Sequence, residues 1–180
     1  HDRVIDLFQK VMLPRPEKIY DSYPHQLSGG QKQRVMIAMA LACSPELLIA
    51  DEPTTALDVT VQKEILRLLR RLQQDSGEMS MIFISHDLAV VAEISDYIAV
   101  MHDGVIVEYG DAKSVLENPQ DTYTKGLMAC RPPLNCRLRR LPTVKEFVDG
   151  VWDSNKDFKS DLVITEEERA SRLKELYSRE

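Results

Sequence analysis

Two carboxylates and one histidine follow short apolar runs, where they could take part in metal and proton chemistry. Asp51 and Glu52 come directly after the apolar run 47–50, and His86 comes shortly after the run 81–84. Magnesium prefers carboxylate and water oxygens, and a second carboxylate can orient or deprotonate an attacking water. A histidine beside them can donate a hydrogen bond to a terminal phosphate. Taken singly, each residue has a structural explanation: the carboxylates could form a strand-ending turn, and the histidine could simply be solvated. The order in which the three residues occur together favours a role in metal and proton chemistry.

The segment LSGGQKQR at 27–34 predicts a helix start that would suit an anion. Ser28 is a good N-cap, and Gln31 completes a capping box. The two glycines between them each cost up to about 1 kcal/mol relative to alanine in a helix, and two basic residues follow where the helix dipole favours negative charge. Bare glycine N–H groups, a hydroxyl and a helix N-terminus together form a phosphate site. A capped helix with two solvated bases is the alternative, and the octet alone does not decide between them.

Apolar periodicity predicts the elements that position these residues. Helices are expected over 2–13, 31–43, 88–94 and from an N-cap at Asp58 to Gly77; strands buried on both faces are expected over 47–50 and 81–84. The helix over 31–43 is nearly all apolar after its start, so we expect it to be largely buried. Alternating strands and helices imply a parallel sheet with right-handed crossovers, covered by helices. Asp51, Glu52 and His86 would then lie at the carboxyl edge of that sheet.

The remaining chain predicts a hairpin, two short helices and an extension. Asp103-Gly104 between the apolar runs 98–101 and 105–109 is typical of a hairpin turn. Short helices are expected over 112–117 and 122–129. We assign 1–130 to one domain and 131–180 to a peripheral extension or linker, because no clear core pattern follows residue 130. Its last segment, 165–180, predicts an exposed charged helix with a capping box formed by Thr165 and Glu168.

Composition narrows the class of protein. The 180 residues are 43% hydrophobic and 29% charged, with a formal charge of −6 and a pI near 5.3. The acidic balance argues against a general nucleic-acid binder. No apolar run approaches the length of a membrane span, and no signal peptide is visible. Three cysteines make no disulfide framework, which favours a reducing, cytoplasmic setting.

Three motifs, in this order and spacing, resemble those of ABC-transporter ATPases. LSGGQKQRV is similar to the signature motif, LLIADEPTTALD to Walker B with the D-loop, and IFISHD to the H-loop. The resemblance covers about residues 1–130. It implies an α/β fold: an incomplete P-loop-NTPase-type domain with a mostly parallel sheet covered by helices and a C-terminal extension.

The resemblance also implies roles for individual residues. Four consecutive residues of the signature motif would contact the γ-phosphate of ATP: Ser28, Gly29, Gly30 and Gln31. Asp51 would hold Mg²⁺ through water, and Glu52 would be the general base. His86 would act as the γ-phosphate switch, and Asp58 would couple the two halves of a dimer.

One departure from the family pattern stands out. No G-x-x-x-x-G-K-[ST] sequence occurs in the chain, which has only seven glycines. We therefore expect the Walker A loop, the adenine-stacking aromatic and the Q-loop to lie upstream of His1, and this chain to be the downstream part of a nucleotide-binding domain. In the family, a signature motif serves the nucleotide held by the opposite domain. The segment at 27–34 would thus be half of a site completed in trans, and the isolated chain would be inactive.

The amino-acid sequences of two segments indicate one branch of the family. YPHQLSGG and ENPQDTYTKGLMA resemble dipeptide and oligopeptide importer ATPases. This predicts an ATPase subunit peripheral to the cytoplasmic face of the inner membrane. Its partners would be permease subunits and a second ATPase domain, in a homodimer, a heterodimer or the same polypeptide, with no nucleic acid. The alternatives are a soluble ABC ATPase of DNA repair or the ribosome, disfavoured by the absence of heptads and basic tracts, and a non-catalytic interaction module, disfavoured by intact Glu52 and His86.

The cysteines do not predict a cluster. Some relatives of the peptide branch carry a four-cysteine Fe–S extension after the domain, and Cys130 and Cys136 fall in that region. A cluster needs four thiolates. Because Cys43 lies in the helix expected to be buried, we expect three free cysteines.

Overall fold

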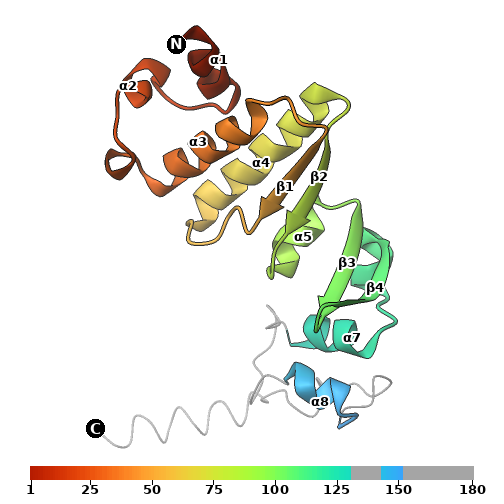
Figure 1. The fold of residues 1–180 in the computed structure, drawn as a ribbon. Helices are drawn as coiled ribbons and strands as arrows, with labels where there is room; N and C mark the ends of the chain where they lie inside the picture. The colour runs from red at the N-terminus through yellow and green to blue at the C-terminus, as the bar shows by residue number, and fades with distance from the viewer. Residues whose placement is uncertain (131–142, 152–180) are drawn as a thin grey trace, which may run out of the picture. The chain divides into compact units, whose positions relative to one another are not determined.

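The computed structural model describes residues 1–130 and 143–151 of the chain. The chain consists of two compact units, His1–Ser95 and Asp96–Glu180. The elements of the first unit are α1 (Asp2–Lys10), α2 (Pro16–Tyr20), a 3₁₀ turn η1 (Pro24–Gln26), α3 (Gly29–Leu41), β1 (Leu47–Asp51), α4 (Val59–Ser76), β2 (Ser80–Ile84) and α5 (Leu88–Ile94) (Figure 1).

The first unit contains the expected parallel strand pair. β1 and β2 pair in parallel from Leu47↔Ser80 to Asp51↔Ile84, and α4 connects them. Asp58 caps α4 as predicted, and Gly77, with φ 64°, ends it in the left-handed conformation that glycine accepts without cost. The strand ends that carry the polar residues therefore lie next to each other.

The core of this unit lies between α4 and the strands. Side chains of α4 at Ile65, Leu68 and Leu69 are almost completely buried, and they belong to one apolar cluster with Val11 and Leu48. Spacings of three and four residues place the α4 side chains on one helix face. The same cluster includes residues of α3 and α5, so one core fixes the position of both strands.

Three expectations about burial were wrong. β1 is buried on one face only, and β2 is half-buried on one face only: Ile49 is 61% exposed, and Ile82 and Ile84 are also exposed. The helix over 29–41 is not largely buried either, because only Ile37 and Ala38 of it are. In the part of the chain that the structure describes, helices cover one face of the strand pair and one side of α3, which leaves the other apolar side chains open to solvent.

The second unit contains the predicted hairpin and helices. β3 (Tyr97–His102) and β4 (Val105–Asp111) pair antiparallel around Asp103-Gly104, whose φ angles of 49° and 78° are those that a two-residue hairpin turn requires. α6 (Ala112–Glu117) and α7 (Thr122–Ala129) match the expected ranges.

A short helix beyond residue 130 was not predicted. α8 (Val144–Val148) packs against α7, and its Phe147 is 2% exposed. A Cβ at Gly126 would lie 3.1 Å from the Cβ of Phe147, so the small residue permits this close approach. The domain boundary at residue 130 stays a prediction, and the helix over 165–180 lies outside the described residues.

Two cysteines fall in the described part of the chain, and both are free. Cys43 follows the end of α3 and is exposed, which corrects the expectation that it lies in a buried helix. Burial raises the pKa of the Cys130 thiol, which therefore stays protonated at neutral pH. Cys136 lies outside the described residues. No helix in the described ranges is long and apolar enough to cross a bilayer.

Candidate functional site

Glu52 and His86 lie side by side where β1 and β2 end. The His86 Nδ1 donates to the Glu52 Oε1 at 2.9 Å, and the Glu52 backbone N–H donates to the Ile84 carbonyl at 3.0 Å, which extends the strand ladder by one residue. Both side chains are accessible, at 40% for Glu52 and 77% for His86. The parallel pairing of the strands thus brings together two of the predicted site residues.

Thr55 holds the other oxygen of the same carboxylate. Its Oγ1 donates to the Glu52 Oε2 at 2.7 Å, and its backbone N–H donates to the Glu52 carbonyl at 3.1 Å. Glu52 has φ 45° and Ala56 has φ 64°, a left-handed conformation that costs about 1–2 kcal/mol per non-glycine residue. Such outliers gather at functional sites, where the surroundings hold them. Sequence reasoning missed Thr55; a hydroxyl three residues after a strand-ending carboxylate could have indicated it.

The hydrogen bonds shift the pKa values of Glu52 and His86 in the directions that favour a charged carboxylate and a charged imidazole. The bond from Thr55, and then the bond from His86, lower the pKa of Glu52. The bond to Glu52 raises the pKa of His86. Glu52 is therefore an anion at neutral pH, and His86 holds its proton more strongly than a free imidazole. Two of about four lone-pair sites of the carboxylate are occupied, so the others remain for a water.

Asp51 suits a metal held mostly by water and phosphate. Its side chain is exposed and has no hydrogen-bond or ion-pair partner within the described ranges. No group of three or more metal-ligating side chains occurs in those ranges either. Magnesium usually keeps several waters and takes only one or two carboxylates, so a single free aspartate beside a phosphate fits this ion.

Ser28 and Gln31 form the predicted capping box at the start of α3. The Gln31 N–H donates to the Ser28 Oγ at 3.3 Å, and the Ser28 N–H donates to the Gln31 Oε1 at 2.9 Å. The first N–H groups of a helix have no intrahelical acceptor, so they remain available to an anion. No hydrogen bond in the described part of the chain joins this capping box to Glu52 or His86.

One of the two glycines of the capping box also serves packing. A Cβ added to Gly30 would lie 2.7 Å from the Val61 Cγ1 of α4, closer than real Cβ atoms come, whereas one added to Gly29 would lie 3.4 Å from the Leu57 Cδ2. Gly30 therefore lets the starts of α3 and α4 approach each other. Gly30 thus has a steric role, which the sequence did not show, in addition to the proposed binding of phosphate.

Asp58 acts in the structure as the N-cap of α4. Its Oδ1 accepts from the backbone N–H groups of Thr60 and Val61, each at 3.0 Å. This confirms the predicted cap. Its coupling of two domains stays a prediction.

Comparison with known proteins tests the resemblance to a family. Residues 1–55 match the family model described as ABC transporter. The chain is 51% identical over 152 residues to the dipeptide transport ATP-binding protein DppD of Haemophilus influenzae, which covers 84% of this chain and 46% of that protein. The resemblance to ABC-transporter ATP-binding proteins is confirmed. The chain spans about half the length of the curated relatives it matches, 46% in this case.

Solved ABC structures share the fold. CbiO1 of Clostridium perfringens, described as part of the ABC transporter complex cbiONQ, superposes with a TM-score of 0.57 at 35% identity, over 65% of this chain and 45% of that one. A dimeric post-hydrolysis state of the ATP-binding cassette MJ0796, bound to ADP and Pi, superposes with a TM-score of 0.53 at 32% identity, over 62% and 46% of the two chains. The α/β fold is therefore that of ABC ATPase domains, as predicted.

Proposed function

We propose that this chain is part of the ATP-hydrolysing subunit that energises an ABC importer of peptides. The observation that carries the proposal is the hydrogen-bonded Glu52–His86 pair at the carboxyl ends of two parallel strands, with Asp51 beside it. The similarity to a dipeptide transport ATP-binding protein supports peptides as the cargo class. We expect the subunit to lie at the cytoplasmic face of the membrane, against permease subunits.

Glu52 would accept a proton from the water that attacks the γ-phosphate of ATP. Thr55 and His86 hold its two oxygens, so the carboxylate is oriented before any nucleotide arrives. Their hydrogen bonds keep it ionised at neutral pH, as a proton acceptor must be. General-base help of this kind contributes a factor of about 10²–10⁴ to the rate.

His86 would join the base to the phosphate. With its Nδ1 proton donated to Glu52, the Nε2 of a protonated imidazole still carries a proton that can be donated to a γ-phosphate oxygen. The raised pKa increases the share of this doubly protonated form. Asp51 would hold a water of the Mg²⁺ ion, which supplies positive charge to the β- and γ-phosphates.

Ser28, Gly29, Gly30 and Gln31 would contact the ATP of a second domain. The capping box makes no hydrogen bond to Glu52 or His86 within the described residues, which suits two half-sites that serve different nucleotides. The dimeric MJ0796 cassette, which shares this fold, is a precedent for a two-domain assembly. Residues 131–180 would form the peripheral extension or linker.

Mixing two inactive variants tests the arrangement. In a longer protein that contains residues 1–180 together with a Walker A loop and that forms homodimers, Ser28→Arg blocks the phosphate position and Glu52→Gln removes the base. If each ATP is served by Glu52 of one copy and Ser28 of the other, a mixed dimer has one intact site, and mixing restores part of the ATPase rate. If both residues serve the same nucleotide from the same copy, mixing restores nothing, and the trans arrangement is wrong.

A further inference from the structure

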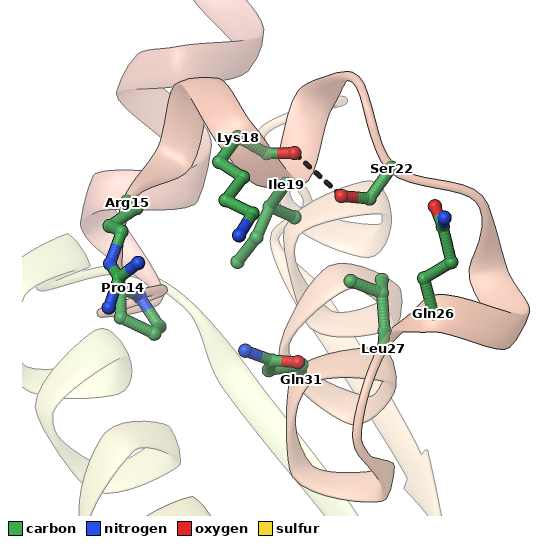
Figure 2. Close-up of a pocket in the computed structure, with 8 residues that line it drawn as sticks. All are labelled: Pro14, Arg15, Lys18, Ile19, Ser22, Gln26, Leu27 and Gln31. Carbon is green, nitrogen blue, oxygen red and sulfur yellow. Dashed lines mark hydrogen bonds between the residues drawn. The ribbon is translucent and has the colours of Figure 1, made fainter.

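A pocket separate from the strand ends lies between α2 and the start of α3. Its volume is about 270 Å³, and neither Glu52 nor His86 lines it. Figure 2 shows the Lys18 side chain and the Gln31 amide directed into the space between Pro14 and Leu27. Of the residues that line this pocket, the proposed ATP chemistry uses only Gln31.

The side chains that line the pocket offer mainly hydrogen-bond donors. Arg15 and Lys18 make no ion pair within the described ranges of the chain. Gln26 and Gln31 each use their Oε1 to accept a backbone N–H, at 2.8 and 2.9 Å, so their amide nitrogens remain as donors. The Ser22 hydroxyl donates to the Lys18 carbonyl at 2.6 Å, which occupies that acceptor. Two positive charges and two amide donors around one space fit a carboxylate or a phosphate.

A nearby cation of the same unit has polar partners inside the protein. The Arg34 guanidinium on α3 donates to the Val11 carbonyl at 2.9 Å and to Glu64 at 3.0 Å. Arg15, in contrast, has φ 52°, a left-handed conformation that costs about 1–2 kcal/mol in a non-glycine residue, and its guanidinium has no partner among the residues that the structure describes. A strained backbone at a residue that lines a pocket favours a function for that residue.

The size and surroundings of the pocket favour a side chain of a protein over a free nucleotide. Its volume lies just below the roughly 300–1,000 Å³ typical of small-molecule sites. Pro14, Ile19 and Leu27 give it apolar walls that suit the methylene stem of a side chain. Tyr20 and Tyr23, next to lining residues in the chain, are exposed, and tyrosine and arginine are both enriched at protein–protein interfaces.

We propose that this pocket receives an aspartate or glutamate side chain from a protein partner that docks on residues 14–31. Its carboxylate would lie among Arg15, Lys18 and Gln31, with the apolar walls around its stem. Gln31 also closes the capping box with Ser28, so the docked partner would contact a residue that holds the start of α3.

Peptide selection on the 180-residue chain tests this without ATP. A displayed library of random peptides is selected on the wild-type chain and on the Arg15→Gln/Lys18→Gln variant. Arg67→Gln/Arg70→Gln, on the exposed side of α4, is the control with the same net charge. We expect peptides from the wild type and from the control to share one position enriched in Asp or Glu, and peptides from the pocket variant to lack it. Absence of that enrichment, or its persistence in the pocket variant, overturns the proposal.

Binding measurements on the best selected peptide complete the test. Changing its acidic residue to the matching amide should weaken binding to the wild-type chain by about 10- to 100-fold, since hydrogen bonds to charged groups are of that strength. The same change should have little effect on binding to the pocket variant. Inorganic phosphate serves as the competing small anion. If phosphate binds in the pocket but the amide change does not matter, the site is a general anion site and the protein-docking proposal is wrong.

Discussion

Replacing Gly30 by alanine tests the close approach of α3 and α4. The new Cβ would lie 2.7 Å from the Val61 Cγ1, and because both atoms belong to helices of one core, neither can move freely. Overpacking of this kind costs about 1–3 kcal/mol. The higher helix propensity of alanine returns at most about 1 kcal/mol. We expect the free energy of unfolding to fall by about 1 kcal/mol.

Gly29→Ala is the matched control. Its Cβ would meet the Leu57 Cδ2 at 3.4 Å, which is an ordinary contact, and its gain in helix propensity is that of the neighbouring position. Urea unfolding followed by far-ultraviolet circular dichroism should therefore find Gly29→Ala at least as stable as the wild type. In a Val61→Ala background, Gly30→Ala should no longer destabilise, because the contacting methyl is gone. Equal unfolding free energies for the two glycine variants would refute the steric explanation.

Four further predictions concern the strand-end site and the cap of α4. The His86 pKa, followed by NMR, should be lower in Glu52→Gln than in the wild type, because the carboxylate that raises it is replaced by a neutral amide. An unchanged pKa would contradict the pairing of Glu52 with His86. The stabilisation from the Glu52–His86 pair should be complete between about pH 4.5 and 6.5, the ordinary pKa values of the two groups. It should be lost on the acid side, as Glu52 protonates below its lowered pKa, and on the basic side, as His86 deprotonates above its raised pKa. Measuring the free energy of unfolding at several pH values checks this. Thr55→Val should raise the pKa of Glu52 and Thr55→Ser should not, as carboxyl NMR titration will decide. Asp58→Ala removes both cap bonds of α4 and should lower the unfolding free energy by about 1 kcal/mol, whereas an unchanged value would show that the cap is not needed.

Local patterns in the sequence predicted most of the elements, because their causes are local. The hairpin at Asp103-Gly104 follows from two residues that accept positive φ, and the ends of α4 follow from the cap at Asp58 and the stop at Gly77. The pairing of Glu52 with His86 followed from one further rule, that the carboxyl ends of parallel strands share an edge.

The features that were missed depend on contacts between distant residues. The apolar run of β1 indicated burial on both faces, but burial depends on what covers each face, and Ile49 is open in the described structure. Phe147 is buried where Gly126, on another helix, leaves room for a close approach. Gly30 has a steric role only because α4 passes close to it. No period or motif in the sequence encodes these distances.

The rate of ATP hydrolysis by Glu52→Gln tests the central claim most directly. The assay uses a longer protein that contains this segment and a Walker A loop. The glutamine amide is nearly isosteric with the carboxylate and can still hydrogen-bond the attacking water, but it cannot accept the proton of that water. We predict a loss of turnover by a factor of about 10²–10⁴, with ATP binding retained and an ATP-dependent dimer stable enough to isolate by size-exclusion chromatography. Hydrolysis at the wild-type rate would contradict the assignment of Glu52 as the base, and loss of ATP binding would show that the residue maintains the site instead of performing the chemistry.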